Sequence, residues 1–161
     1  MKSSRKDIVI GFILIIALVG GIFFYKNLKT PKVLPTSTPL TIKSKIEGLF
    51  NYVIPDDLDS IELKDVTGGI YRGIAARKFE KRIFTITVLA DLPDLSSNEF
   101  YEGWVFSGDK FISIGKLRIA KGGFLVDFTS NTDYSSYNKV TVTKEKVNDN
   151  KPESLILEGS F

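Results

Sequence analysis

The stretch from Leu92 to Gly123 constrains the fold of this chain more than any other part of the sequence. It opens on a Leu-Pro turn and enters an aromatic segment that contains the only Trp. It then turns over Ser107-Gly108-Asp109 and runs back to a second turn at Gly122-Gly123. Runs of β-branched and aromatic residues bounded by Gly, Asp and Ser are typical of β-hairpins. We therefore expect everything C-terminal to Ser60 to consist of strands that pack around this hairpin.

Apolar residues that alternate with a period of two predict further strands on both sides of the hairpin. The clearest alternation runs from Phe84 to Leu92, and weaker ones lie near 61–63, 70–79, 124–128, 140–142 and 155–161. Many short strands joined by turn residues indicate an all-β sandwich or barrel. We favour an antiparallel β-sandwich of about eight strands that spans residues 58–161.

The return strand of the hairpin changes the phase of its apolar residues. Ile112 and Ile114 precede Gly115-Lys116, whereas Leu117 and Ile119 follow it. Because a slip of one residue turns a strand face over, this change of parity predicts a β-bulge or kink at Gly115.

Residues 8–25 are eighteen consecutive uncharged, mostly apolar residues. As a helix they reach roughly 27 Å, enough to cross a bilayer core. The rival interpretation is a cleavable signal peptide, but Gly20-Gly21 is not followed by a small-x-small site. Flanking basic residues are equal in number, and the N-terminal amine favours a cytoplasmic N-terminus. We expect a single-pass anchor in the cell membrane, with residues 1–7 as a cytoplasmic tail and the rest extracytoplasmic.

Two short segments follow the predicted anchor. Residues 26–40 contain a proline at every fourth position (Pro31, Pro35, Pro39), which favours an extended linker. Residues 41–54 place apolar side chains at helical spacing, with Thr38 as the expected N-cap and Pro55 as the expected stop. This short amphipathic helix either docks on the following domain or lies in the membrane interface, and we favour docking.

Composition excludes several classes of function. Residues 1–32 hold six basic side chains and one acid, which leaves 16 basic and 18 acidic residues in 33–161. A nucleic-acid partner is therefore not expected, because the folded part lacks a basic surplus. The chain has no Cys and no His, so disulfides, thiol nucleophiles, Cys/His zinc sites and imidazole bases are ruled out.

No pattern in the sequence predicts a catalytic, metal or cofactor site. The carboxylate pairs Asp56-Asp57 and Asp91/Asp94 flank prolines and suit turns. Asn148-Asp149-Asn150 lacks the glycine and the distant glutamate of a calcium loop, so we expect a turn. The prediction is a protein that is not an enzyme and needs no cofactor.

Several segments together resemble a known family. Leu-Pro-Asp-Leu from Leu92, Phe-Tyr-Glu-Gly-Trp from Phe100, a Gly-bearing strand, a Val-x-Val strand and Pro-Glu-Ser-Leu from Pro152 occur in the order found in the C-terminal domain of anti-sigma-K factors. The resemblance covers about 60–161. The residues that fit the family pattern, which the resemblance implies are structural, are Leu92, Pro93, Tyr101, Trp104, Gly115, Val140, Val142, Glu145, Pro152 and Gly159.

The resemblance implies an extracytoplasmic β-sandwich tethered by one transmembrane helix. Full-length members also have a cytoplasmic zinc-binding anti-sigma module, built on His and Cys. Only seven residues precede the predicted anchor here, and His and Cys are absent, so this chain is not expected to sequester a sigma factor by itself. Gly103, Lys146 and Asn148-Asp149 also depart from the family pattern.

The most direct prediction of function is a membrane-anchored sensor or interaction module that binds an envelope protein partner. Tyr134 and Tyr137 flank Ser135-Ser136 in a polar loop and are the candidate partner-binding residues. The alternative is a cell-wall or glycan-binding protein, for which Tyr101, Trp104 and Phe106 offer a stacking shelf. Because Trp in a small β domain is more often buried, we expect these three aromatic residues to belong to the core.

Overall fold

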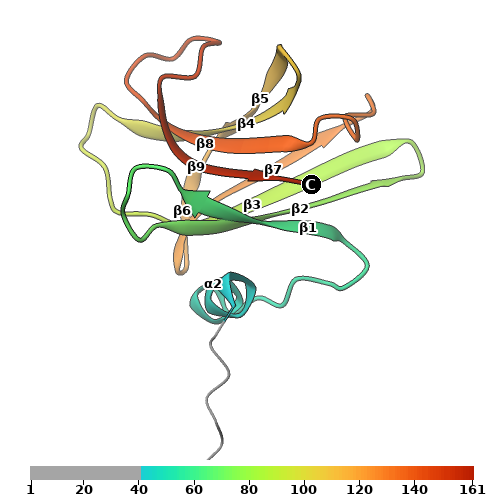
Figure 1. Cartoon of the computed structure of the whole chain (residues 1–161), viewed down its shortest axis with the longest axis horizontal. Helices are drawn as coiled ribbons and strands as arrows, with labels where there is room; N and C mark the ends of the chain where they lie inside the picture. The colour runs from blue at the N-terminus through green and yellow to red at the C-terminus, as the bar shows by residue number, and fades with distance from the viewer. Residues whose placement is uncertain (1–40) are drawn as a thin grey trace, which may run out of the picture. The chain divides into compact units, whose positions relative to one another are not determined.

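The computed structural model describes residues 41–161, which fold into one short helix and nine strands (Figure 1). Helix α2 spans Ile42–Phe50. The strands are β1 (Asp59–Asp65), β2 (Arg72–Glu80), β3 (Ile83–Asp91), β4 (Phe100–Ser107), β5 (Lys110–Lys116), β6 (Arg118–Ala120), β7 (Gly123–Ser130), β8 (Lys139–Glu145) and β9 (Ser154–Ser160).

All nine strands belong to one antiparallel sheet in the order β5-β4-β8-β9-β1-β2-β3-β7-β6. The two end strands, β5 and β6, are consecutive in the chain and are separated only by Leu117. The sheet therefore curls back on itself and is nearly closed, with β4 and β8 facing β2 and β3 (Figure 1). The predicted all-β antiparallel architecture is confirmed. The strands join in a single sheet, so a sandwich of two separate sheets is not shown.

The main core lies inside the curl. Leu63, Ala75, Phe84, Val88, Val105, Val140, Val142 and Leu157 are among its buried side chains. They come from both facing halves of the sheet, at the alternating positions that point inward. Burial of this apolar surface at roughly 25 cal/mol per Å² is what holds the two halves together.

The predicted bulge at Gly115 is confirmed. Gly103 pairs with Gly115 and Trp104 pairs with Ser113, so Ile114 is the extra residue on β5. Gly115 has φ +109°, a conformation that glycine adopts without steric cost. Ile114 turns into the core beside Gly103, where an added Cβ would lie 2.8 Å from Ile114 Cγ1. The bulge thus fills the space that a larger residue at 103 would occupy.

Of the three aromatic residues expected in the core, Tyr101 and Trp104 are buried and Phe106 is only partly buried, and only Tyr101 belongs to the main core. Trp104 is 1% exposed, and its Nε1 donates to Thr143 Oγ1 at 2.7 Å. Tyr101 is 2% exposed, and its hydroxyl donates to the Pro93 carbonyl at 3.2 Å. Loss of water around the phenol raises the pKa of Tyr101 to about 12. Neither ring is available as a stacking shelf.

Helix α2 is shorter than the predicted 41–54. It begins after Thr41, whose Oγ1 accepts from Ser44 N at 3.2 Å, so the expectation of Thr38 as N-cap is wrong. It ends at Phe50, because Asn51 adopts the left-handed conformation (φ 51°, ψ 44°) that terminates helices well before Pro55. Ile46 and Phe50 are buried against β2 and β3, which confirms docking on the domain.

Within residues 41–161 no helix has the length and apolar character needed to span a bilayer. The tail 1–7, the predicted anchor 8–25 and the linker 26–40 lie outside the described residues.

Candidate functional site

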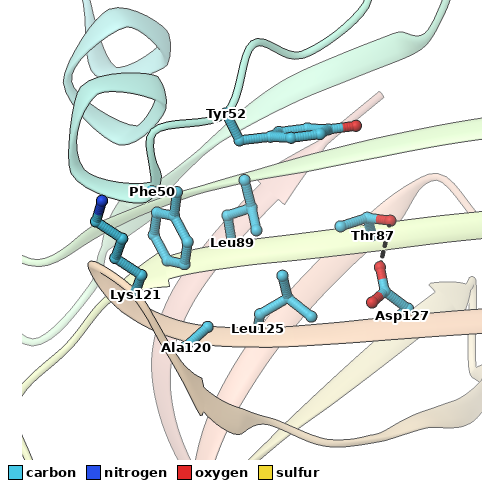
Figure 2. Close-up of a pocket in the computed structure, with 8 residues that line it drawn as sticks. All are labelled: Phe50, Tyr52, Thr87, Leu89, Ala120, Lys121, Leu125 and Asp127. Atoms are coloured by element: carbon cyan, nitrogen blue, oxygen red, sulfur yellow. Dashed lines mark hydrogen bonds between the residues drawn. The ribbon is translucent and has the colours of Figure 1, made fainter.

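A pocket of about 320 Å³ opens beside the C-terminal end of α2, on the outer face of β3, β7 and β6 (Figure 2). We call it the α2 groove. It is lined by Phe50, Tyr52, Thr87, Leu89, Ala120, Lys121, Leu125 and Asp127. Its residues come from segments far apart in the sequence, which the curled sheet brings together.

The end of α2 positions the aromatic wall of the groove. Glu47 fixes the segment after the helix, because its Oε1 accepts from Ile54 N at 2.9 Å and its carbonyl accepts from Tyr52 N at 3.1 Å. Ile54 is 2% exposed, so the segment is anchored at both ends. Phe50 is buried against the sheet, whereas the Tyr52 side chain is left half exposed above the groove.

The floor is the part of the outer sheet face that α2 does not cover. In β3 and β7 the residues Val88 and Val126 point into the core, so their neighbours Leu89 and Leu125 point outward. Leu89 is 2% exposed and packs under Phe50, and Leu125 continues the apolar surface toward β6. The floor can therefore hold an apolar or aromatic group away from water.

The two ends of the groove carry polar groups of opposite charge. Asp127 accepts from Thr87 Oγ1 at 2.8 Å and from Arg118 at 3.0 Å, so its carboxylate is already paired. Lys121 lies at the other end, beside Phe50 (Figure 2), and has no ion pair within residues 41–161. The arrangement suits binding of an apolar group with an anionic neighbour rather than proton transfer.

Gly122 brings Lys121 to this place. The residue has φ +93° in the β6–β7 turn, and a Cβ added to it would lie 2.3 Å from the carbonyl oxygen of Leu49. Only glycine allows the turn to approach the backbone of α2 so closely. The helix end and the turn are thus fixed against each other at one rim of the groove.

The candidate residues Tyr134 and Tyr137 lie elsewhere. Their rings contact each other at 5.2 Å between centroids, and Tyr134 also contacts Phe84 and Phe128 at 5.8 and 6.0 Å. Both side chains are partly buried and pack against the main core. The structure does not bring them together with the α2 groove, and their predicted role in partner binding remains a prediction.

The family-pattern residues are spread through the sheet. Leu92, Tyr101, Trp104, Val140, Val142 and Glu145 are buried, Gly115 forms the bulge, Pro93 is exposed, and Pro152 and Gly159 are partly buried. None of them lines the α2 groove. A Cβ on Gly159 would lie 2.5 Å from the Glu62 carbonyl oxygen, so this position packs tightly against β1.

Two carboxylates close the loop after β8. Glu145 is fully buried, and its Oε1 accepts from Glu153 N at 3.0 Å. Glu153 in turn accepts from the backbone amides of Lys146 and Val147 at 3.0 and 3.1 Å. Asp149 accepts from Lys151 N at 2.9 Å, which makes the Asn148-Asp149-Asn150 segment a turn. In the part of the chain that the structure describes, no group of three or more potential metal ligands is gathered.

Sequence reasoning placed Phe50 on an amphipathic helix but missed the groove. Asn51 directly after the apolar helix face was the available signal, because asparagine is a common left-handed C-cap. It would have ended the helix before Tyr52 and left that side chain free. No local sequence pattern indicated that Lys121 and Asp127 would line a groove.

Comparison of the chain with protein-family models, curated protein sequences and solved structures finds no match in any of the three.

Proposed function

We propose that this chain is a membrane-anchored extracytoplasmic module of the cell envelope that binds a protein partner through the α2 groove. Residues 8–25 would supply the single-pass anchor, with the N-terminus cytoplasmic. The observation on which the proposal rests is the pocket with an apolar floor that lies beneath the half-exposed Tyr52 and beside Lys121, which has no ion pair within residues 41–161.

The rim of the groove has the character of an interaction surface. Tyr52 is 50% exposed, and Leu49 and Val53, which adjoin the groove residues Phe50 and Tyr52 in sequence, are 41% and 77% exposed. Contiguous exposed apolar groups commonly mark binding sites, and tyrosine is enriched in the centre of protein interfaces. Lys121 adds a charged group that would favour an acidic neighbour on the partner.

The resemblance to anti-sigma-K factors supports a sensory role and rests on the motif residues alone. In this proposal the module senses or recruits a partner outside the membrane. It does not sequester a sigma factor by itself, because the sequence contains none of the His and Cys residues on which the zinc-binding module of that family is built.

In-cell photo-crosslinking tests the proposal. A benzophenone amino acid at position 52 is expected to trap a specific envelope protein, because the side chain projects over the groove. The same amino acid at Asp109, an exposed turn residue, is the matched control. Equal labelling patterns from the two positions would contradict a binding role for the groove.

A second experiment tests the topology. A protease recognition site inserted in the linker 26–40 is expected to be cut when protease is added to intact spheroplasts, which releases the folded body. Cleavage only after lysis would place the body in the cytoplasm and remove the envelope partner from consideration.

Glycan binding is the second candidate. It is favoured by the half-exposed Tyr52 ring, which lies near the hydroxyl of Thr87 and the carboxylate of Asp127 (Figure 2). Aromatic faces flanked by hydrogen-bonding groups suit ligands with both apolar and polar surface.

A further inference from the structure

The sheet is open along one seam, where β6 parts from β4. Leu117 is the last residue that bonds to β4, because its amide donates to the Tyr101 carbonyl at 2.8 Å. From Arg118 onward the chain pairs with β7 instead. Within residues 41–161 the strand order ends at β6, so no strand pairs with its other edge. An unpaired strand edge is a template for a further strand.

A pocket of about 420 Å³ lies in this seam. Its apolar lining includes the buried Tyr101, Leu117 and Phe124 of the main core, together with Ile119. Ile119 is 77% exposed, which is unusual for a large apolar residue on a sheet edge. The seam pocket therefore offers an apolar site that leads inward from the free edge of β6.

The α2 groove lies on the opposite face of the same strand. Leu117 and Ile119 line the seam pocket, whereas Ala120 and Lys121 line the groove. Successive side chains of an extended peptide beside β6 would therefore alternate between the two hollows, since neighbouring strands share the same pleat. The two sites have the geometry required for a single extended ligand.

The register of the β6–β7 hairpin leaves the backbone N–H and C=O of Ile119 free to form hydrogen bonds on the side of β6 away from β7. Ala120 and Gly123 flank a two-residue turn and form its closing, hydrogen-bonded pair. In antiparallel ladders such pairs alternate with pairs that are not hydrogen-bonded to each other. Ile119 pairs with Phe124 in the latter class, so its N–H and C=O point away from β7.

The charges around the seam pocket favour a basic ligand. Asp94 and Glu99 line it, and among the described residues its lining includes no lysine or arginine, although Lys116 Nζ lies 3.8 Å from the ring centroid of Phe100, which is part of the lining. Glu99 is partly neutralised, since Lys144 lies 3.4 Å away and Ser96 Oγ donates to it at 2.8 Å. Asp94, which also lines the pocket, has no ion pair within residues 41–161.

We infer that β6 binds an extended peptide segment by strand addition, with an apolar side chain in the seam pocket and a basic residue facing Asp94. Because β6 is only three residues long, it supplies few backbone bonds, and the pockets on its two faces must provide most of the affinity. This inference deepens the proposed function, because one of the two pockets is the α2 groove, but it does not depend on the proposed membrane topology or on the identity of the envelope partner.

The test uses the full chain in lipid nanodiscs and a phage library of random octapeptides. Enriched peptides are expected to combine apolar and Lys/Arg residues at alternating positions. Their affinity should fall about tenfold in Ile119→Lys, which adds a like charge at the edge, and severalfold in Asp94→Asn. Asp109→Asn, at the exposed β4–β5 turn and outside both pockets, is the control expected to change affinity little. Unaltered Trp104 fluorescence would show that each variant is folded.

N-methylation of the selected peptide separates strand addition from other modes of binding. Methyl groups on amides that face β6 remove backbone bonds and should lower affinity about tenfold, whereas those on the alternate amides should be neutral. The inference is overturned if no peptide is enriched, if Ile119→Lys leaves binding intact, or if N-methylation of successive amides lowers affinity equally at every position.

Discussion

Gly122 determines, as a single residue, how close the β6–β7 turn lies to α2. Alanine there would combine a left-handed backbone (φ +93°) with a Cβ 2.3 Å from the Leu49 carbonyl oxygen. We expect Gly122→Ala to lower the free energy of unfolding by about 2 kcal/mol, measured by urea titration of Trp104 fluorescence. Gly48→Ala is the matched control, because no atom beyond its chain neighbours and the backbone of its own helix lies within 4 Å of the added Cβ. That helix substitution should instead stabilise the protein by about 0.5–1 kcal/mol. Equal stability of Gly122→Ala and wild type would show that the close approach is not required.

Asp65 organises the loop between β1 and β2 and predicts a pH effect. Its carboxylate accepts from Thr67 Oγ1 at 2.6 Å, from Thr67 N at 2.7 Å and from Tyr71 N at 3.0 Å. The hydrogen bond from the Thr67 side chain, the largest cause, holds the pKa of Asp65 below its ordinary value of 3.8. A carboxylate whose pKa is lower in the folded state contributes stability above its unfolded pKa, and this is lost as pH falls through the folded pKa.

We therefore expect Asp65→Asn to flatten the loss of stability on acidification below about pH 4. Urea midpoints of wild type and variant, measured between about pH 3 and 6, provide the comparison. Asp109→Asn at the exposed β4–β5 turn is the control. If the urea midpoint of Asp65→Asn fell with decreasing pH as steeply as that of wild type, the Asp65 carboxylate would be excluded as a cause of the acid-induced loss of stability.

The β5 bulge couples two neighbouring strands at the scale of the element. Gly103 on β4 lies against Ile114, the extra residue of the bulge. We expect Gly103→Ala to cost about 1–3 kcal/mol, because its Cβ would lie 2.8 Å from Ile114 Cγ1 in a packed core. The cost should shrink in the background of Ile114→Ala, which removes the opposing atoms. A double-mutant cycle from chemical denaturation measures the coupling, and an interaction energy below about 0.5 kcal/mol would contradict the packing argument.

Local patterns were sufficient to predict most elements. Alternation located the strands, and the parity change at Gly115-Lys116 located the bulge, because both depend on residues adjacent in sequence. The start and end of α2 were wrong, because several residues compete as caps. Thr38 and Thr41 are both of a residue type that is favoured at N-caps, and Asn51 ends the helix earlier than Pro55 would. Which cap is used depends on how Ile46 and Phe50 dock on β2 and β3, which the local sequence does not contain.

The α2 groove could not be predicted because its residues meet only through long-range pairing. Tyr52 follows α2, Thr87 lies on β3 and Asp127 on β7, and the β3–β7 pairing joins strands separated by the whole aromatic hairpin. Loop tyrosines were the available sequence signal for binding, and that signal indicated Tyr134 and Tyr137, which pack on Phe84 and Phe128. Exposure, rather than residue type, distinguishes Tyr52 from them.

At the scale of the whole molecule, the two candidate functions predict that substitution of Tyr52 affects different ligands. If the α2 groove binds a protein partner, Tyr52→Ala should lower recovery of that partner by at least about tenfold, because aromatic residues at interface centres contribute about 2 kcal/mol or more. Tyr52→Phe, which keeps the ring, should retain most of the binding. Retention of the full chain on purified cell wall should be the same in wild type and Tyr52→Ala. Loss of wall retention in Tyr52→Ala, with near-ultraviolet circular dichroism unchanged and partner recovery independent of Tyr52, would instead identify a glycan-binding protein.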